Sequence, residues 1–218
     1  MKVVVYTCIT GNYDTLKEPI LTEEGWDYIC FTDNPSFTSH TWTIRTIPDE
    51  LNNLDNARKN KLIKVLAHVY LKEYDLSIYI DGNITINFQL DKLVRGIIDA
   101  EHHTYLKKHP SRHCIYEEAK VCERLHKDEP EIIHKQIERY HNEGFPKNFG
   151  MSENNILIRL HNDKYCAELM DAWASEIVNG SKRDQLSLFY CIWKLGTKGI
   201  KMFKNYDFLK CRTHKKSC

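Results

Sequence analysis

The stretch LSIYIDGN, residues 76–83, decides the fold class. Leu76–Ile80 has the apolar character of a short buried strand, and Asp81, Gly82 and Asn83 follow where that strand ends. Similar strand signals alternate with helical ones along most of the chain. We therefore expect an α/β fold with a mixed, mainly parallel central sheet flanked by helices. In an open sheet of this class the ligand crevice lies outside the carboxyl ends of the strands, which is where these three residues would stand.

Hydrophobic periodicity predicts the remaining elements. Strands are expected at residues 3–9, 27–32, 41–47 and 155–160, and helices at residues 54–71, 90–100, 114–125, 131–142, 163–178 and 183–195. No repeat, linker or low-complexity stretch interrupts them. Because 218 residues with 42% hydrophobic content can bury one substantial core, we expect a single domain over residues 1–218.

Charge is distributed unevenly, although the net charge is only +1. From Lys198 to the end there are seven Lys or Arg and one acid, Asp207. This basic tail is either a solvated terminus, or a segment that folds over an anion such as a diphosphate or rests on an acidic membrane surface. We expect no nucleic-acid partner.

The start of the chain and its cysteines bear on the compartment. Met1 and Lys2 run directly into a strand-like segment instead of a signal peptide, and no stretch has the apolar length of a membrane span. The eight cysteines lack C-x-x-C pairs and the eleven His lack zinc-site spacing, which favours reduced core thiols. We expect a cytoplasmic protein without a transmembrane segment, with the basic tail as a peripheral contact to the inner membrane surface.

The oxygen-bearing side chains of Asp81 and Asn83 emerge from an apolar strand, and such oxygens suit a hard cation, Mn²⁺ or Mg²⁺. The cation would also take oxygens from a substrate diphosphate and neutralise charge on the departing nucleotide. The alternative is structural, because Asp-Gly between apolar runs is also a strong hairpin signal.

Each of two further clusters of polar residues has a functional interpretation and a structural alternative. Arg58 and Lys61 at the start of a helix predict an anion site, or a solvated first turn. A cluster over residues 109–118 offers bases, a fixed cation and carboxylates that could orient acceptor hydroxyls or a sugar ring. Its alternative is a surface loop followed by an acidic helix start.

A third cluster is the pair Asp184-Gln185 at the start of the last helix. Asp184 is a candidate for contacting a transferred sugar or for acting as a base. Equally, Ser181 and Asp184 fit a capping box, which explains Asp184 but not Gln185.

In order and spacing, eight stretches resemble the glycosyltransferase-like domain family found in plant Golgi proteins of cell-wall mucilage synthesis and in bacterial polysaccharide loci. They are VVYTCITGNYD (4–14), DYICFTDN (27–34), ARKNKLIKVLAH (57–68), YDLSIYIDGNI (74–84), HPSRHCIYEEA (109–119), QIERYHNEGFP (136–146), GMSENNILIRLHN (150–162) and SKRDQLSLFYCIW (181–193). Together they cover most of the chain.

The resemblance implies a GT-A fold, with a nucleotide-sugar-binding half at residues 1–88, an acceptor half at 89–197 and the basic tail at 198–218. It implies that Asp81 and Asn83 are a variant Asp-x-Asp motif for Mn²⁺ or Mg²⁺, with the late His214 as a candidate further ligand. The neutral Asn83 is a weaker ligand than an acid, which leaves metal dependence open. Plant relatives carry a membrane anchor and this chain shows none.

The resemblance also assigns roles to the other candidates. Those expected at the nucleoside pocket and diphosphate are Thr7, Gly11, Tyr13, Asp33, Arg58 and Lys61. Those expected at the reacting sugar are Asp184 and Gln185, placed like the Asp-Gln pair of retaining, glycogenin-like enzymes. Apart from the resemblance, we expect His109 of the cluster over residues 109–118 to take part in catalysis. We expect Arg112, Tyr116, Glu117 and Glu153 to contact the substrate.

These residues and the resemblance are compatible with three functions. The leading hypothesis is metal-assisted transfer of a hexosyl or uronosyl unit from a UDP-sugar to a glycan or lipid-linked acceptor. The transfer would serve polysaccharide or glycoconjugate synthesis. We expect it to retain the anomeric configuration of the sugar in preference to inverting it. The second is an inactive nucleotide- or carbohydrate-binding module, suggested by Asn83. The third is a hydrolase that uses Glu117 or Glu118 with His109.

Overall fold

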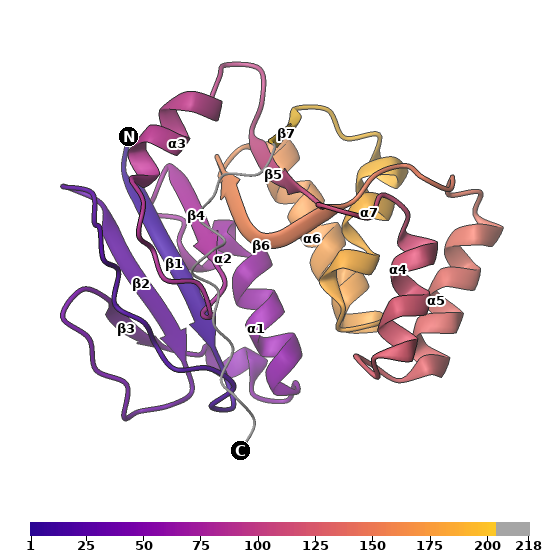
Figure 1. The fold of residues 1–218 in the computed structure, drawn as a ribbon, viewed down its shortest axis with the longest axis horizontal. Coiled ribbons are helices and arrows are strands. Elements are labelled where there is room, and N and C mark those ends of the chain that lie inside the picture. The colour runs from indigo at the N-terminus through magenta and orange to yellow at the C-terminus, as the bar shows by residue number, and fades with distance from the viewer. Residues whose placement is uncertain (204–218) are drawn as a thin grey trace.

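The structure is a computed structural model that describes residues 1–203, so His214 and the expected tail from residue 204 onward lie outside the described residues. Its centre is a sheet of seven strands with helices on both faces (Figure 1). The strands are β1 (Val3–Ile9), β2 (Asp27–Thr32), β3 (Thr43–Thr46), β4 (Leu76–Ile80), β5 (Thr104–Lys108), β6 (Ser152–Arg159) and β7 (Ile200–Phe203).

The strand order is β3-β2-β1-β4-β6-β5-β7. The strand β1 is parallel to β2 and β4, β2 is parallel to β3, and β5 is parallel to β7. Only β6 runs antiparallel to its neighbours, β4 and β5. The prediction of a mixed, mainly parallel sheet is confirmed. Since β1 and β4 are adjacent and parallel, the residues that follow them lie together at one edge of the sheet.

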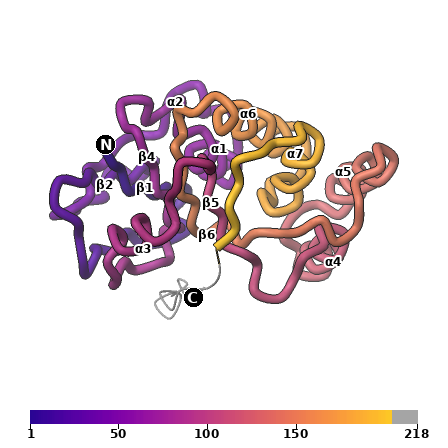
Figure 2. The backbone as a smooth tube through the Cα atoms, turned by 90° about the horizontal axis from the view of Figure 1, so that it is seen from above, coloured from indigo at the N-terminus to yellow at the C-terminus, as the bar shows by residue number. Residues whose placement is uncertain are grey.

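The helices of the described residues cover both faces of the sheet and extend beyond one end of it. They are the short 3₁₀ turns η1 (Asp49–Leu51) and η2 (Asp184–Leu186), and the α-helices α1 (Asn56–Val65), α2 (Ala67–Tyr70), α3 (Leu90–Ile97), α4 (Ile115–Arg124), α5 (Pro130–Asn142), α6 (Lys164–Asn179) and α7 (Leu188–Leu195). Figure 2 shows α3 on one side of the strands and α1 and α6 on the other. Within residues 1–203 none of these helices has the length and apolar character needed to cross a membrane.

Side-chain alternation along β1 explains the two cores. Val4, Tyr6 and Cys8 pack into the cluster beneath α1 and α6. Val3 and Val5 point to the opposite face, into the cluster that contains α3. Because both faces are covered, the strand is buried throughout, and its apolar sequence follows from that burial.

The single helix expected over residues 54–71 is interrupted at Leu66, which has non-helical dihedral angles (φ −88°, ψ 47°). The Arg159 guanidinium donates to the backbone carbonyls of Lys64 (2.8 Å) and Val65 (2.9 Å), and the Tyr6 hydroxyl also donates to the Lys64 carbonyl (2.5 Å). These buried side chains occupy carbonyls that a continuous helix would use, so the long expected helix is two shorter ones.

Other differences also have local reasons. The strand β5 was not predicted, because its sequence TYLKK has little strand character, yet Lys107 in it is fully buried against Glu153. The strand β7 lies in the segment expected as tail and is a short, half-exposed edge strand. The segment expected as one helix from residue 183 begins with the turn η2, so Asp184 and Gln185 precede α7.

Candidate functional site

One cavity of ≈ 700 Å³ opens at the carboxyl ends of β1 and β4, between the sheet and the part formed by α4 and η2. The sequence candidates that line it are Gly11, Tyr13, Lys61, Asp81, Asn83, His109, Arg112, Glu153, Asp184 and Gln185. They come from both halves of the chain. These candidates therefore lie together at this edge of the sheet, whereas Thr7, Asp33, Arg58, Tyr116 and Glu117 are outside the cavity lining.

The segment Asp81-Gly82-Asn83 is a turn at the cavity wall and not the tip of a β-hairpin. The neighbours of β4 are β1 and β6, and the Asp81 amide continues the pairing with β6 by donating to the Asn155 carbonyl (2.9 Å). Gly82 packs so closely on Ile9 that a Cβ would lie 2.7 Å from Ile9 Cγ1. The turn is thus built to bring Asp81 beside the end of β1.

A buried ionic network joins this turn to η2. Lys64 Nζ lies 2.7 Å from Asp184 Oδ2 and 3.8 Å from Asp81 Oδ1, and Lys61 Nζ lies 3.5 Å from Asp184 Oδ1. Lys64 and Asp184 are 1% and 3% exposed, so the pair is shielded from water. The Trp173 indole donates to the Asp184 carbonyl (2.9 Å) and fixes the backbone of the turn.

The network limits what Asp184 can do. Burial alone would raise the pKa of this carboxyl, but the charges of Lys61, Lys64 and Arg183 hold the pKa below its ordinary value. A carboxylate held ionised by two ammonium groups is a poor proton acceptor. Of the two roles expected for Asp184, orienting a sugar fits this geometry better than acting as a base.

The nucleoside candidates divide into two groups. Tyr13, 75% exposed, and Gly11 line the cavity, and the Gly11 amide donates to both carboxylate oxygens of Asp33 (3.0 Å each). Asp33 therefore fixes the loop after β1 and is itself outside the cavity lining. Thr7 is buried and lines a small neighbouring hollow behind Gly82.

The structure does not bring Arg58 into the cavity. Its guanidinium donates to the carbonyls of Ile177 (3.1 Å) and Gly180 (2.6 Å) at the end of α6, and to the carboxylate of Asp55 (2.6 Å). Asp55 is also the N-cap of α1 and accepts from the Arg58 amide (3.0 Å). Arg58 therefore joins α1 to α6, and only Lys61 of the expected diphosphate pair lines the cavity.

At the α4 end, the two expected carboxylates have separate surroundings. Glu118 is buried and forms an ion pair with Arg112, whereas Glu117 is exposed and does not line the cavity. Tyr116 donates to the Phe145 carbonyl (2.7 Å) and also lies outside it. Of these two carboxylates only Glu118 lines the cavity with His109, and it is paired with Arg112, which does not favour the hydrolase hypothesis.

A family comparison bears on this cavity. The model of the TOD1/MUCI70, glycosyltransferase-like domain matches residues 1–216. The chain belongs to this family. None of the curated proteins compared with the chain matches it. Membership of the TOD1/MUCI70 family supports a glycosyltransferase-like function in general, with a sugar donor and an acceptor as the classes of partner. The observed sheet is consistent with a Rossmann-like glycosyltransferase fold.

The polar cavity residues of this TOD1/MUCI70 domain that were not singled out from the sequence include Lys64, Asn154, Asn155 and Arg183. Asn155 is 3% exposed, and neither its Oδ1 nor its Nδ2 has a hydrogen-bond partner among the described residues. A buried amide without partners costs about 1–3 kcal/mol, which a bound ligand could recover. The signal available in the sequence was the pair Asn154-Asn155 ahead of an apolar strand.

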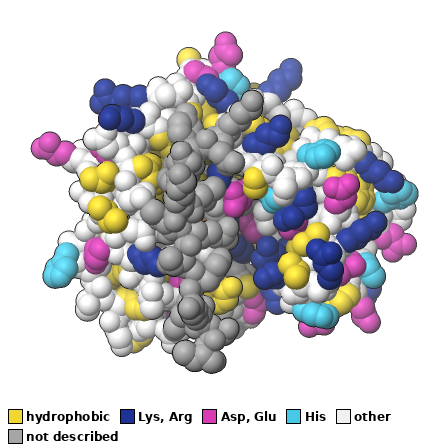
Figure 3. Space-filling view, viewed as in Figure 1, with side chains coloured by type: hydrophobic (Ala, Val, Ile, Leu, Met, Phe, Trp, Pro, Cys, Tyr) yellow, Lys and Arg dark blue, Asp and Glu magenta, His cyan; other side chains and the backbone are white. Residues whose placement is uncertain are grey.

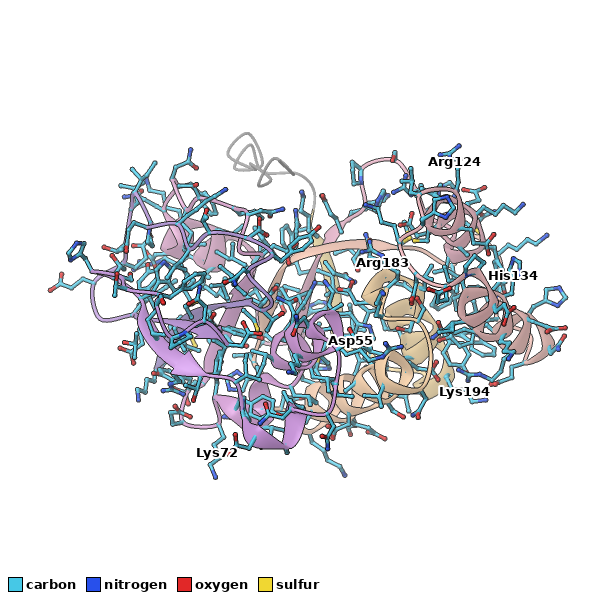
Figure 4. The ribbon with its side chains drawn as sticks, turned by 90° about the horizontal axis from the view of Figure 1, so that it is seen from below. Asp55, Lys72, Arg124, His134, Arg183 and Lys194 are labelled. Atoms are coloured by element: carbon cyan, nitrogen blue, oxygen red, sulfur yellow. The ribbon has the colours of Figure 1, made fainter. Side chains whose placement is uncertain are left out.

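Arg183 extends the polar surface toward the helical lobe formed by α4, α5 and α7. Figure 4 shows it between the strands and this lobe, while Arg124 and His134 lie on the outer side of the lobe. Figure 3 shows further Lys and Arg side chains spread over the same lobe. Inside the cavity, Arg112, Lys182 and Arg183 make the α4 end rich in hydrogen-bond donors.

The described residues of the TOD1/MUCI70 domain fit a divalent cation in company with a substrate. Among residues 1–203 no group of three or more His, Cys, Asp and Glu side chains could hold a metal ion. Asp81 and Asn83 supply one carboxylate and one amide oxygen, and Mg²⁺ is commonly held by one or two carboxylates together with substrate phosphates. The donor set therefore suits a cation bridged to a diphosphate.

Proposed function

We propose that this domain transfers a sugar from a nucleoside-diphosphate donor, a UDP-sugar, to a glycan or lipid-linked acceptor in polysaccharide or glycoconjugate synthesis. The observation that carries the proposal is the convergence of Asp81, Asp184 and Asn155 in one cavity at the carboxyl ends of the strands. The choice of UDP follows from the resemblance alone. The transferred unit is a hexosyl or uronosyl group.

Each wall of the cavity has a part in this proposal. Tyr13 and the loop held by Asp33 would hold the nucleoside, and Asp81 and Asn83 would hold Mn²⁺ or Mg²⁺. The cation supplies charge neutralisation at the departing diphosphate when it is bound. Asn155, with an unmade donor and an unmade acceptor, matches sugar hydroxyls, which both give and accept hydrogen bonds.

Retention of the anomeric configuration is proposed in preference to inversion. An inverting transfer needs a base for the acceptor hydroxyl, and Asp184 is poorly suited because Lys61 and Lys64 keep it ionised. Its fixed negative charge would instead stabilise positive charge that develops on the sugar.

The proposed compartment is the cytoplasm. All six cysteines among residues 1–203 are buried free thiols, in keeping with a reducing environment: Cys8, Cys30, Cys114, Cys122, Cys166 and Cys191. Peripheral membrane contact through the basic tail stays a proposal on residues outside those that the structure describes.

The test is turnover of a panel of UDP-sugars with Mn²⁺, Mg²⁺ or EDTA. Asp81→Ala should remove turnover while the unfolding curve keeps its shape, since Asp81 lies at the cavity edge. Asp91→Ala is the matched control, because Asp91 pairs with Arg95 on α3 and lies outside the cavity lining. Wild-type binding of UDP without release of sugar in any acceptor screen would instead support the binding-module hypothesis.

A further inference from the structure

His109 stands at the end of β5, where its amide donates to the Met151 carbonyl (3.0 Å). Its ring is largely buried, with 8% of the residue exposed, and it lines the cavity near Arg112 and Glu153. The position of the ring is therefore fixed by the sheet, while part of it faces the space where a substrate would lie.

The Nδ1 atom of His109 is committed to its own loop. The backbone N–H groups of Ser111 and Arg112 point at it, with N···Nδ1 distances of 3.2 Å and 2.9 Å. A backbone N–H can only donate, so Nδ1 must keep its lone pair, and the proton of the neutral imidazole must sit on Nε2. Protonation of Nδ1 would break both of these hydrogen bonds.

The surroundings also disfavour the imidazolium form. The charged groups that face the ring are Lys107 from β5, Glu153 from β6, Arg112 from the loop and Glu118 from α4. Lys107 pairs with Glu153 (2.6 Å) and Arg112 pairs with Glu118, so the two carboxylates are already balanced by cations. Burial lowers the pKa of His109, and the nearby Arg112 charge lowers it further.

We propose that His109 is a specificity-determining residue that stays neutral and presents Nε2–H to the cavity as a fixed hydrogen-bond donor. It would recognise a substrate oxygen that accepts a hydrogen bond, such as a hydroxyl or carboxylate oxygen of the sugar or of the acceptor. It would not serve as an acid or base. That the substrate is a sugar rests on the proposed function, whereas the tautomer and charge of the ring do not.

The charge and tautomer are tested by NMR of ¹⁵N-histidine-labelled protein. The spectrum should contain an imidazole with the Nε2–H tautomer pattern at neutral pH whose titration midpoint lies below the ordinary His value of about 6.5. This signal should be absent from His109→Asn. A midpoint at or above the ordinary His value, or an Nδ1–H pattern, would overturn the inference whether or not the protein turns over a sugar.

The function of the donor is tested by two substitutions that separate the ring nitrogens. His109→Asn keeps an acceptor oxygen near the position of Nδ1 and removes the Nε2 donor. His109→Gln keeps an N–H donor near Nε2 and removes the acceptor for Ser111 and Arg112. With UDP-sugars as probes, we expect the Asn variant to lose about 10-fold or more in kcat/KM, as for a lost hydrogen bond, and the Gln variant to keep more activity.

The reverse order would overturn the inference. If His109 only supports the loop, His109→Asn should match the wild type and His109→Gln should be the weaker enzyme. The loss expected for His109→Asn should also be independent of pH above the ordinary His value of about 6.5. If the wild type turns over no UDP-sugar, the proposed function fails, and the NMR spectrum then decides the state of His109 by itself.

Discussion

Lys64 and Asp184 form the most deeply buried ion pair at the cavity, and the pair links acid stability to the site. The pKa of Asp184 is lower in the folded protein than in the unfolded chain. The ionised carboxylate therefore stabilises the fold at pH values above the ordinary carboxyl pKa. This stabilisation is lost as the pH falls toward the pKa of the folded protein. Between about pH 5 and pH 3, the wild type should lose on the order of 1 kcal/mol that Asp184→Asn does not lose.

Urea unfolding at a series of pH values measures this difference. The Asn variant keeps the shape of the side chain, so its curve isolates the charge. Parallel acid dependence in the two proteins would contradict the account of Asp184 as a paired carboxylate.

A second residue-scale prediction concerns Gly82. Its replacement by Ala would place Cβ 2.7 Å from Ile9 Cγ1, and overpacking of this kind costs about 1–3 kcal/mol. Gly82→Ala should also displace Asp81 and lower turnover. In the double variant with Ile9→Ala, denaturant unfolding should show a smaller penalty for the Gly82 substitution. An equal penalty in both backgrounds would show that this contact is not the cause.

Predictability from sequence differs between these residues. Asp81 and Asp184 can be identified from the sequence because each is a polar residue next to an apolar run. Lys64 cannot, because its partner is 120 residues away and a Lys on a helix normally faces water. Asn155 was missed for the same reason, since its role depends on burial that only the assembled sheet creates.

At the scale of elements, Arg58 provides the clearest test. It bonds the last carbonyls of α6, so Arg58→Met should destabilise the protein by about 1–3 kcal/mol through orphaned carbonyls. It should leave UDP affinity nearly unchanged, because Arg58 does not line the cavity. Lys61→Met is the comparison: it removes a cavity cation, and calorimetry should show weaker UDP binding. If Arg58→Met weakened UDP binding and Lys61→Met did not, the result would contradict this assignment and support Arg58 as the diphosphate contact.

Local pattern predicted the elements that are amphipathic or fully apolar, such as β1 and α6. It failed where a distant side chain changes the backbone, as Arg159 does at the end of α1. It also failed where burial of a charge is balanced by a partner, as for Lys107 in β5 and its partner Glu153. Both failures have a tertiary cause that is absent from the local sequence.

At the scale of the molecule, the cavity is lined both by residues that follow the strands and by residues of the helical lobe, and it draws them from the chain between positions 8 and 185. Because residues 1–203 offer a cation one carboxylate, from Asp81, and one amide oxygen, from Asn83, we expect metal and nucleotide to bind cooperatively. Each would complete the site for the other.

The most direct measurement of the central claim is a thermal-shift titration of the wild type and Asp81→Ala with UDP, with Mn²⁺ and with both. A ligand that binds the native state raises the unfolding temperature. The account predicts that UDP and Mn²⁺ together raise it by more than the sum of their separate effects, and that Asp81→Ala removes the excess. Stabilisation by UDP that is indifferent to Mn²⁺, to EDTA and to the Asp81 substitution would contradict it.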